Sequence, residues 1–224
     1  MGISKILLLA LIAFVSTKNF VFIGDSRTVG IAVYLFGYGY YETTAYYGTG
    51  TNVVGTKAVT YSGHNVKAVC ETGASYVQFA NPNKSVYKGM HKALSESTSG
   101  TQVILWLGVN GLDHTGTFNL YKNLANKYKS LRFHAISITG VVPSKAGISN
   151  DRIKTFNSNL KTMIKNAKIN NLQYKSILRN DDPTNIFNNG NIVLNVNAAT
   201  TDAYGLHYKT DGYRAIFNAM ISGL

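Results

Sequence analysis

The chain has 224 residues, 45% of them hydrophobic and 12% aromatic, and 22 Lys and Arg against 10 Asp and Glu give it a formal net charge of +12. This length is enough for one substantial core and short for two, so we expect a single domain over residues 18–224. The lone Cys70 excludes an internal disulfide framework. The charge suits an anionic polymer or a cell surface, but no block of five basic residues occurs, which argues against dedicated nucleic-acid binding.

The first seventeen residues have the layout of a secretory signal peptide. Lys5 supplies one positive charge, the apolar run 6–15 follows, and small polar residues come next. The run is too short to span a membrane. We therefore predict a leader at residues 1–17 and a secreted or cell-surface location. The alternative is an amphiphilic first helix or strand of the fold, and the protein would then be cytoplasmic.

The segment that follows presents a serine directly after a buried strand. Residues 20–23, Phe-Val-Phe-Ile, predict a buried parallel strand, and Gly24 permits a tight turn before a helix. Ser26 would lie at the amino end of that helix, where free N–H groups and the helix dipole stabilise negative charge. The serine is either a nucleophile or a helix cap. We expect Asp25 to bond N–H groups of the turn and Arg27 to be solvated rather than to hold an anionic substrate.

The rest of the chain alternates predicted strands with predicted helices. A segment rich in Gly, Tyr and Thr, residues 37–60, is expected to form a long loop near the entrance of the site. Apolar runs predict the strands, and apolar residues at three- and four-residue spacing predict the helices. The predicted strands are 66–70, 103–108, 133–139 and 174–178, and the predicted helices are 87–94, 118–131 and 153–167. Such alternation implies a parallel sheet covered on both faces, with the active site at the carboxyl ends of its strands.

Four glycine-containing blocks stand out along this pattern. They are Gly24-Asp25-Ser26, Glu71-Thr72-Gly73-Ala74, Gly108-Val109-Asn110 and Gly205-Leu206-His207-Tyr208. In this order, and within residues 20–213, they resemble the motifs of the SGNH/GDSL hydrolase family. The resemblance implies a flavodoxin-like three-layer α/β/α sandwich with a mostly parallel central sheet, hydrolysis of carboxylic esters, and no metal or organic cofactor.

The resemblance also implies a role for each residue. Ser26 would be the nucleophile and His207 its general base, because a histidine can take the hydroxyl proton and return it to the leaving alcohol. The oxyanion hole would consist of the N–H groups of Ser26 and Gly73 and the side-chain amide of Asn110. Taken alone, Asn110 and Gly73 also fit ordinary turns and His207 a structural histidine. The other histidines show no metal-ligand spacing.

Two positions depart from the family pattern. The family usually has an aspartate after the asparagine, where this chain has Gly111, and a triad acid three residues before the histidine, where this chain has Tyr204. Asp202, five residues before His207, can serve as the acid if the turn between them is looped outward. The aspartates at 181–182 are more distant candidates. Without an acid, a backbone carbonyl would orient the imidazole in a Ser-His dyad.

These features predict a serine esterase that works through an acyl-enzyme, and more specifically a carbohydrate O-deacetylase. The aromatic segment 37–60, the positive charge and the predicted export all suit an acylated glycan as substrate. A lysophospholipase or thioesterase remains an alternative within the same class. The alternative from another class is a catalytically impaired protein of this fold that binds an anionic glycan or wall polymer, which Tyr204 and the charge of +12 motivate.

Overall fold

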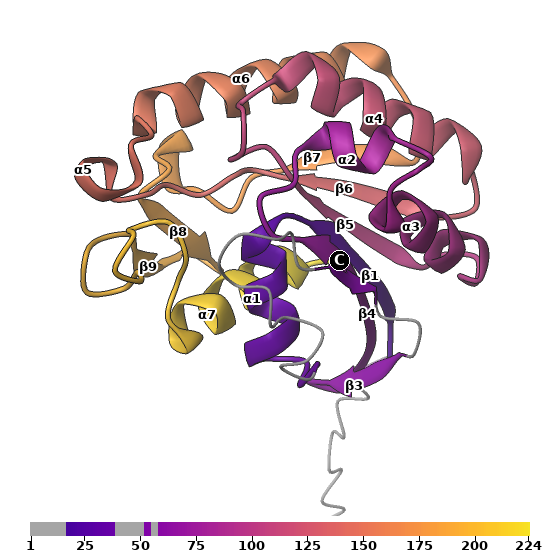
Figure 1. Cartoon of the computed structure of the whole chain (residues 1–224), viewed down its shortest axis with the longest axis horizontal. Coiled ribbons are helices and arrows are strands. Elements are labelled where there is room, and N and C mark those ends of the chain that lie inside the picture. Colours follow the sequence, from indigo (N-terminus) through magenta and orange to yellow (C-terminus); the bar gives the residue numbers. More distant parts are fainter. Residues whose placement is uncertain (1–16, 39–51, 55–57) are drawn as a thin grey trace, which may run out of the picture.

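A computed structural model describes residues 17–38, 52–54 and 58–224, and in this part of the chain a central sheet lies between two layers of helices (Figure 1). The main sheet has the strand order β2-β4-β1-β5-β6-β7, with β3 paired to β4 as well. Strands β4, β1, β5, β6 and β7 are parallel, whereas β2 and β3 run antiparallel to β4. The strands are β1 (Asn19–Gly24), β2 (Asn52–Val54), β3 (Val59–Tyr61), β4 (His64–Glu71), β5 (Gln102–Trp106), β6 (Arg132–Ile136) and β7 (Leu172–Lys175). The predicted α/β sandwich with a mostly parallel, flavodoxin-like sheet is confirmed.

The helices divide between the two faces of this sheet. Helices α1 and α7 pack against each other on one face, and α2, α3, α4 and α6 cover the other (Figure 1). A small antiparallel pair of strands, β8 and β9, lies beside α7. These elements are α1 (Ser26–Tyr34), α2 (Tyr76–Ala80), α3 (Ser85–Ser95), α4 (His114–Lys127), α5 (Pro143–Ala146), α6 (Asn150–Ala167), the 3-10 turn η2 (Arg179–Asp181), β8 (Asn185–Asn188), β9 (Asn191–Asn195) and α7 (Thr210–Ile221).

Strand β1 lies in the middle of the sheet, which explains its unbroken apolar sequence. Its residues 20–23 are at most 2% exposed because helices cover both faces of the strand. In the register of the sheet, Gly24 lies between Cys70 of β4 and Trp106 of β5. The chain passes from β1 to β4 on one side and then returns across to β5 on the other. This reversal is the topological switch point at which open α/β sheets bind their ligands.

The predicted strands and helices are present, with shifted ends. The strand predicted at 133–139 is β6, which ends at Ile136, and the one predicted at 174–178 is β7, which begins at Leu172 and ends at Lys175. The helix predicted at 118–131 is α4, which begins at His114 because the Asp113 side chain caps it by accepting from the Gly116 N–H.

The prediction of a long loop over residues 37–60 is wrong in part. Strand β2 and the start of β3 fall inside this segment, and both pair with β4. Valines at 53, 54 and 59 supply the β-branched residues that favour strands. Residues 39–51 and 55–57 lie outside the described part, as do residues 1–16 of the predicted leader.

The elements predicted from the sequence do not include helix α7, although the apolar spacing typical of a helix is present. Tyr213, Ile216, Phe217 and Met220 recur at three- and four-residue spacing and are all buried. In the described residues, no helix has the length and apolar character needed to cross a membrane.

Candidate active site

Ser26 is placed by the junction between β1 and α1. It is the first residue of α1, and the preceding Asp25 caps the helix by accepting a hydrogen bond of 3.0 Å from the Arg27 N–H. Asp25 also accepts from the N–H of Gly108, and burial raises its pKa to about 6. The predicted role of Asp25 in bonding the turn is therefore confirmed. Ser26 itself is 8% exposed, at the carboxyl edge of the sheet and at the positive end of the helix dipole.

His207 and Asp202 face each other across a hairpin. A β-bridge joins Thr201 to Tyr208, and the Asp202 N–H donates to the His207 carbonyl at 2.8 Å. The turn includes Gly205, whose φ of 66° lies in the left-handed region that favours glycine. The backbone pairing places residues 202 and 207 directly opposite each other. A separation of five residues therefore brings the carboxylate to the imidazole.

A chain of hydrogen bonds links the three side chains. His207 Nε2 lies 2.9 Å from Ser26 Oγ, and His207 Nδ1 lies 2.9 Å from Asp202 Oδ2. A carboxylate only accepts hydrogen bonds, so Nδ1 donates its proton to Asp202, and Nε2 keeps the lone pair that accepts from the serine hydroxyl. The structure thus brings together the predicted nucleophile, base and acid.

The charge states of the pair follow from their surroundings. Burial opposes ionisation of Asp202, but hydrogen bonds from His207 and from the Leu206 N–H outweigh burial and hold the pKa of Asp202 below its ordinary value. Burial lowers the pKa of His207, Asp202 acts in the opposite direction, and nearby Arg27 adds to the lowering. At neutral pH the carboxylate is therefore ionised and the imidazole is neutral, which is the state of a base ready to accept a proton.

The two other candidate acids are engaged elsewhere. Asp181 forms an ion pair with Lys161 at 3.5 Å. Asp182 accepts hydrogen bonds from Thr184 and Asn185 in its own turn. Asp202 is thus the candidate carboxylate that contacts the imidazole.

The loops after β4 and β5 flank Ser26 on either side of β1. Gly73 follows β4 with a φ of 74°, and a Cβ at this position would meet no atom within 4 Å, so the glycine serves the backbone conformation and leaves open space. Asn110 follows β5, and its side-chain Nδ2 donates to the Ala74 carbonyl at 2.9 Å. This bond joins the two loops and leaves a second N–H on the amide. The loops that carry Gly73 and Asn110 therefore meet at the carboxyl edge of the sheet.

The prediction that Arg27 is solvated is wrong. Its side chain is 1% exposed and donates to the carbonyls of Thr139, Gly140 and Leu206 at 2.8, 3.2 and 3.2 Å. The guanidinium carbon also lies 5.5 Å from the ring centroid of Tyr208. Because Leu206 and Tyr208 flank His207, Arg27 ties the start of α1 to the hairpin that carries His207.

Comparisons with known proteins identify the fold. No family model matches the sequence, and no curated protein matches it. Among solved structures, a family 3 carbohydrate esterase from Clostridium thermocellum is 18% identical, with a TM-score of 0.53, and the match covers 91% of this chain and 92% of that one. A lipase/acylhydrolase from Enterococcus faecalis is 13% identical, with a TM-score of 0.54 and coverage of 92% and 93%.

An acetyl-xylooligosaccharide esterase from Geobacillus stearothermophilus gives a similar match. It is 9% identical, with a TM-score of 0.55 and coverage of 90% of this chain and 91% of that one. At such low identities these likenesses show the fold. The chain has the fold of the SGNH/GDSL hydrolases, as the four sequence blocks predict.

Proposed function

We propose that this protein is a serine esterase that hydrolyses carboxylic esters through an acyl-enzyme, with Ser26 as nucleophile, His207 as general base and Asp202 as the triad acid. The observation that carries the proposal is the hydrogen-bond chain from Ser26 Oγ through both imidazole nitrogens to the Asp202 carboxylate. Such a chain raises the nucleophilicity of a hydroxyl that is otherwise unreactive near neutral pH.

The proposed reaction has two halves. In the first, Ser26 Oγ attacks the acyl carbon while His207 Nε2 takes the hydroxyl proton. The bond from the acyl carbon to the alkoxy oxygen then breaks, and the imidazolium returns the proton to the leaving alcohol. In the second half, His207 takes a proton from water, which attacks the acyl-enzyme. The bond from the acyl carbon to Ser26 Oγ then breaks, the imidazolium returns its proton to Oγ, and the carboxylic acid leaves.

The negative charge of each tetrahedral intermediate falls on the former carbonyl oxygen. We assign its stabilisation to the N–H groups of Ser26 and Gly73 and to the second N–H of the Asn110 amide. The amino end of α1 supports this assignment, because its first N–H groups have no acceptor within the helix. Hydrogen-bonding the Asn110 amide to Ala74 fixes its orientation in advance, which is what makes such donors effective.

For the substrate, we propose an O-acetylated carbohydrate. The support is that two structures of the same fold are named a carbohydrate esterase and an acetyl-xylooligosaccharide esterase. The alternative substrate within the same class is an ester of a longer acyl chain, because another structure of this fold is named a lipase/acylhydrolase. The Asp202 carboxylate beside His207 supports the catalytic proposal over a protein that only binds, because it supplies the acid that is absent at position 204.

The direct test is labelling with a fluorophosphonate, measured by mass spectrometry, together with turnover of p-nitrophenyl acetate. The parent protein, Ser26→Ala and His207→Ala are compared, each lacking residues 1–17. We expect labelling and turnover in the parent and neither in the two variants. A well-folded parent that is not labelled at Ser26 would refute the proposal and favour the binding protein. Turnover that rises steeply from acetyl to long acyl esters would instead refute the deacetylase.

A further inference from the structure

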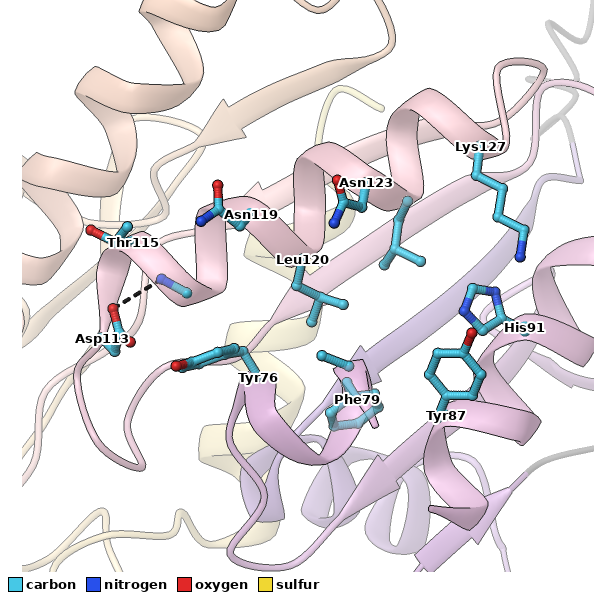
Figure 2. A pocket seen from close by; sticks show the side chains of 13 residues that line it. Tyr76, Phe79, Tyr87, His91, Asp113, Thr115, Asn119, Leu120, Asn123 and Lys127 are labelled. Atoms are coloured by element: carbon cyan, nitrogen blue, oxygen red, sulfur yellow. Dashed lines mark hydrogen bonds between the residues drawn. The ribbon is translucent and has the colours of Figure 1, made fainter. Parts of the chain in front are cut away.

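A groove of about 590 Å³ follows helix α4 (Figure 2). At one end it is lined by Tyr76 and Asp113, which come three residues after Gly73 and Asn110 respectively. At the other end it is lined by Lys127. The groove therefore has one end where α2 and α4 begin, just after the two loops that flank Ser26, and it runs along α2, α3 and α4.

Helix α4 supplies one side of this groove with two parallel rows of residues. Thr115, Asn119, Asn123 and Lys127 recur at every fourth position, are exposed and line the groove. Residues four apart lie on the same side of a helix, so these side chains form one polar row about 18 Å long. The adjoining residues Gly116, Leu120 and Leu124 form an apolar floor, in which the two leucines are buried.

The opposite side carries aromatic rings held in place by their neighbours. Tyr76 lies so close to α4 that a Cβ on Gly116 would be 2.1 Å from its Cζ, and its hydroxyl bonds to the Asp113 carboxylate. The ring of Tyr87 contacts that of His91 at a centroid distance of 4.2 Å. Figure 2 shows Tyr76 and Tyr87 across from α4, on α2 and α3. An apolar floor, an aromatic wall and a polar row thus face one open channel.

The charges that line the groove cancel, although the whole chain carries +12. Asp113 is negative, since the Gly116 N–H and other hydrogen bonds hold its pKa below the ordinary value. Lys127 is positive at the other end. Burial lowers the pKa of His91, so its ring is neutral at pH 7. The groove therefore suits a neutral occupant rather than an anionic polymer.

We propose that this groove binds a neutral oligosaccharide chain and positions it so that an acetyl group on one sugar reaches Ser26. This inference rests on the proposed esterase function. Sugar rings have apolar C–H faces that stack on tyrosine and hydroxyl edges that bond to amides and hydroxyls, which matches the two sides of the groove. A long acyl chain has no such edges, and it would cover the amides of Asn119 and Asn123 without giving them partners.

The test compares chain length on the full protein. Acetylated hexasaccharides and disaccharides of xylose, glucose and mannose are the substrates, and p-nitrophenyl acetate reports the chemistry alone. We expect kcat/KM to be higher for at least one hexasaccharide than for its disaccharide. The double variant Asn119→Ala/Asn123→Ala should raise KM for that hexasaccharide about 10-fold, because each neutral hydrogen bond contributes several-fold to affinity. Turnover of p-nitrophenyl acetate should change less than twofold.

The matched control is Asn126→Ala, an exposed asparagine of α4 that does not line the groove and is expected to leave both activities unchanged. Two results overturn the groove proposal when p-nitrophenyl acetate is still hydrolysed. Either kcat/KM does not depend on chain length for any of the three sugars, or the double variant shows the same dependence as the parent. If turnover rises with the length of the acyl chain and the double variant changes that rise, the groove binds the acyl chain. This result also overturns the oligosaccharide proposal. A parent protein that does not hydrolyse p-nitrophenyl acetate refutes the esterase function itself. Titration of Ser26→Ala with the unacetylated hexasaccharides then tests the groove by binding alone.

Discussion

Replacing Asp202 by asparagine tests the triad most sharply. The variant keeps an oxygen that can accept from the N–H groups of Tyr204, Leu206 and His207, as Asp202 Oδ1 does at 3.1, 3.2 and 3.3 Å. It replaces the carboxylate oxygen at His207 Nδ1 by an amide that donates. The imidazole must then accept at Nδ1 and carry its proton on Nε2, facing Ser26. In this tautomer it cannot take the hydroxyl proton.

The expected loss is large. Where a triad depends on its acid for the tautomer, exchange for asparagine lowers kcat about 10⁴-fold, equal to about 5.4 kcal/mol of activation free energy. The assay is kcat for p-nitrophenyl acetate at pH 7.5, with urea unfolding to establish that the fold is kept. Asp211→Asn is the control, because Asp211 is an exposed aspartate that pairs with Arg214 on α7. A folded Asp202→Asn protein within tenfold of the parent would refute the acid assignment and leave a dyad.

Four further predictions concern donors, protonation and burial. Asn110→Ala removes one donor of the proposed oxyanion hole and should lower kcat about 100-fold to 1,000-fold with little change in KM, measured with p-nitrophenyl acetate. Because burial lowers the pKa of His207 and the base must be neutral, kcat/KM should rise with pH through an inflection below pH 6.5. Arg27→Met should shift that inflection to higher pH, since Arg27 contributes to the lowering, and an unshifted inflection would contradict this electrostatic role. The same variant should reduce the free energy of unfolding by about 2 kcal/mol, because the carbonyls of Thr139 and Leu206 lose this donor while that of Gly140 keeps the Tyr208 hydroxyl. Burial lowers the pKa of His134 to about 4, so the unfolded state, with a pKa near 6.5, binds the proton first as pH falls. The protein should lose about 3 kcal/mol of stability from this group between pH 6.5 and 4, and urea unfolding of His134→Gln should show that much less acid dependence than the parent.

The sequence was informative where local pattern and burial coincide. The apolar runs of β1 and β5 predict central strands, and the glycine-containing turns after them place Ser26 and Asn110 at one edge of the sheet. Every parallel strand ends at the same edge, so residues after separate strands can be assigned to one site without knowledge of their contacts.

Contacts between distant segments set the limits of such prediction. The separation of Asp202 from His207 departs from the family spacing, and only the backbone pairing of the hairpin shows that the two side chains meet. A charged residue after the nucleophile is expected to face water, because arginine is rarely fully buried. Arg27 is buried because three carbonyls from two distant loops converge on its guanidinium, and nothing near it in sequence indicates them.

The hairpin at residues 201–208 carries both the imidazole and the carboxylate, whereas the serine lies 181 positions away in the chain. Its own backbone bonds fix the geometry between Asp202 and His207, so the pair behaves as a preassembled unit. The tertiary structure then sets the position of this unit relative to α1, and Arg27 contributes to it through the Leu206 carbonyl. A rigid displacement of the hairpin would break the contact between His207 Nε2 and Ser26 Oγ while leaving the imidazole and carboxylate paired. Loss of activity on mild destabilisation should thus precede loss of the Asp202–His207 contact.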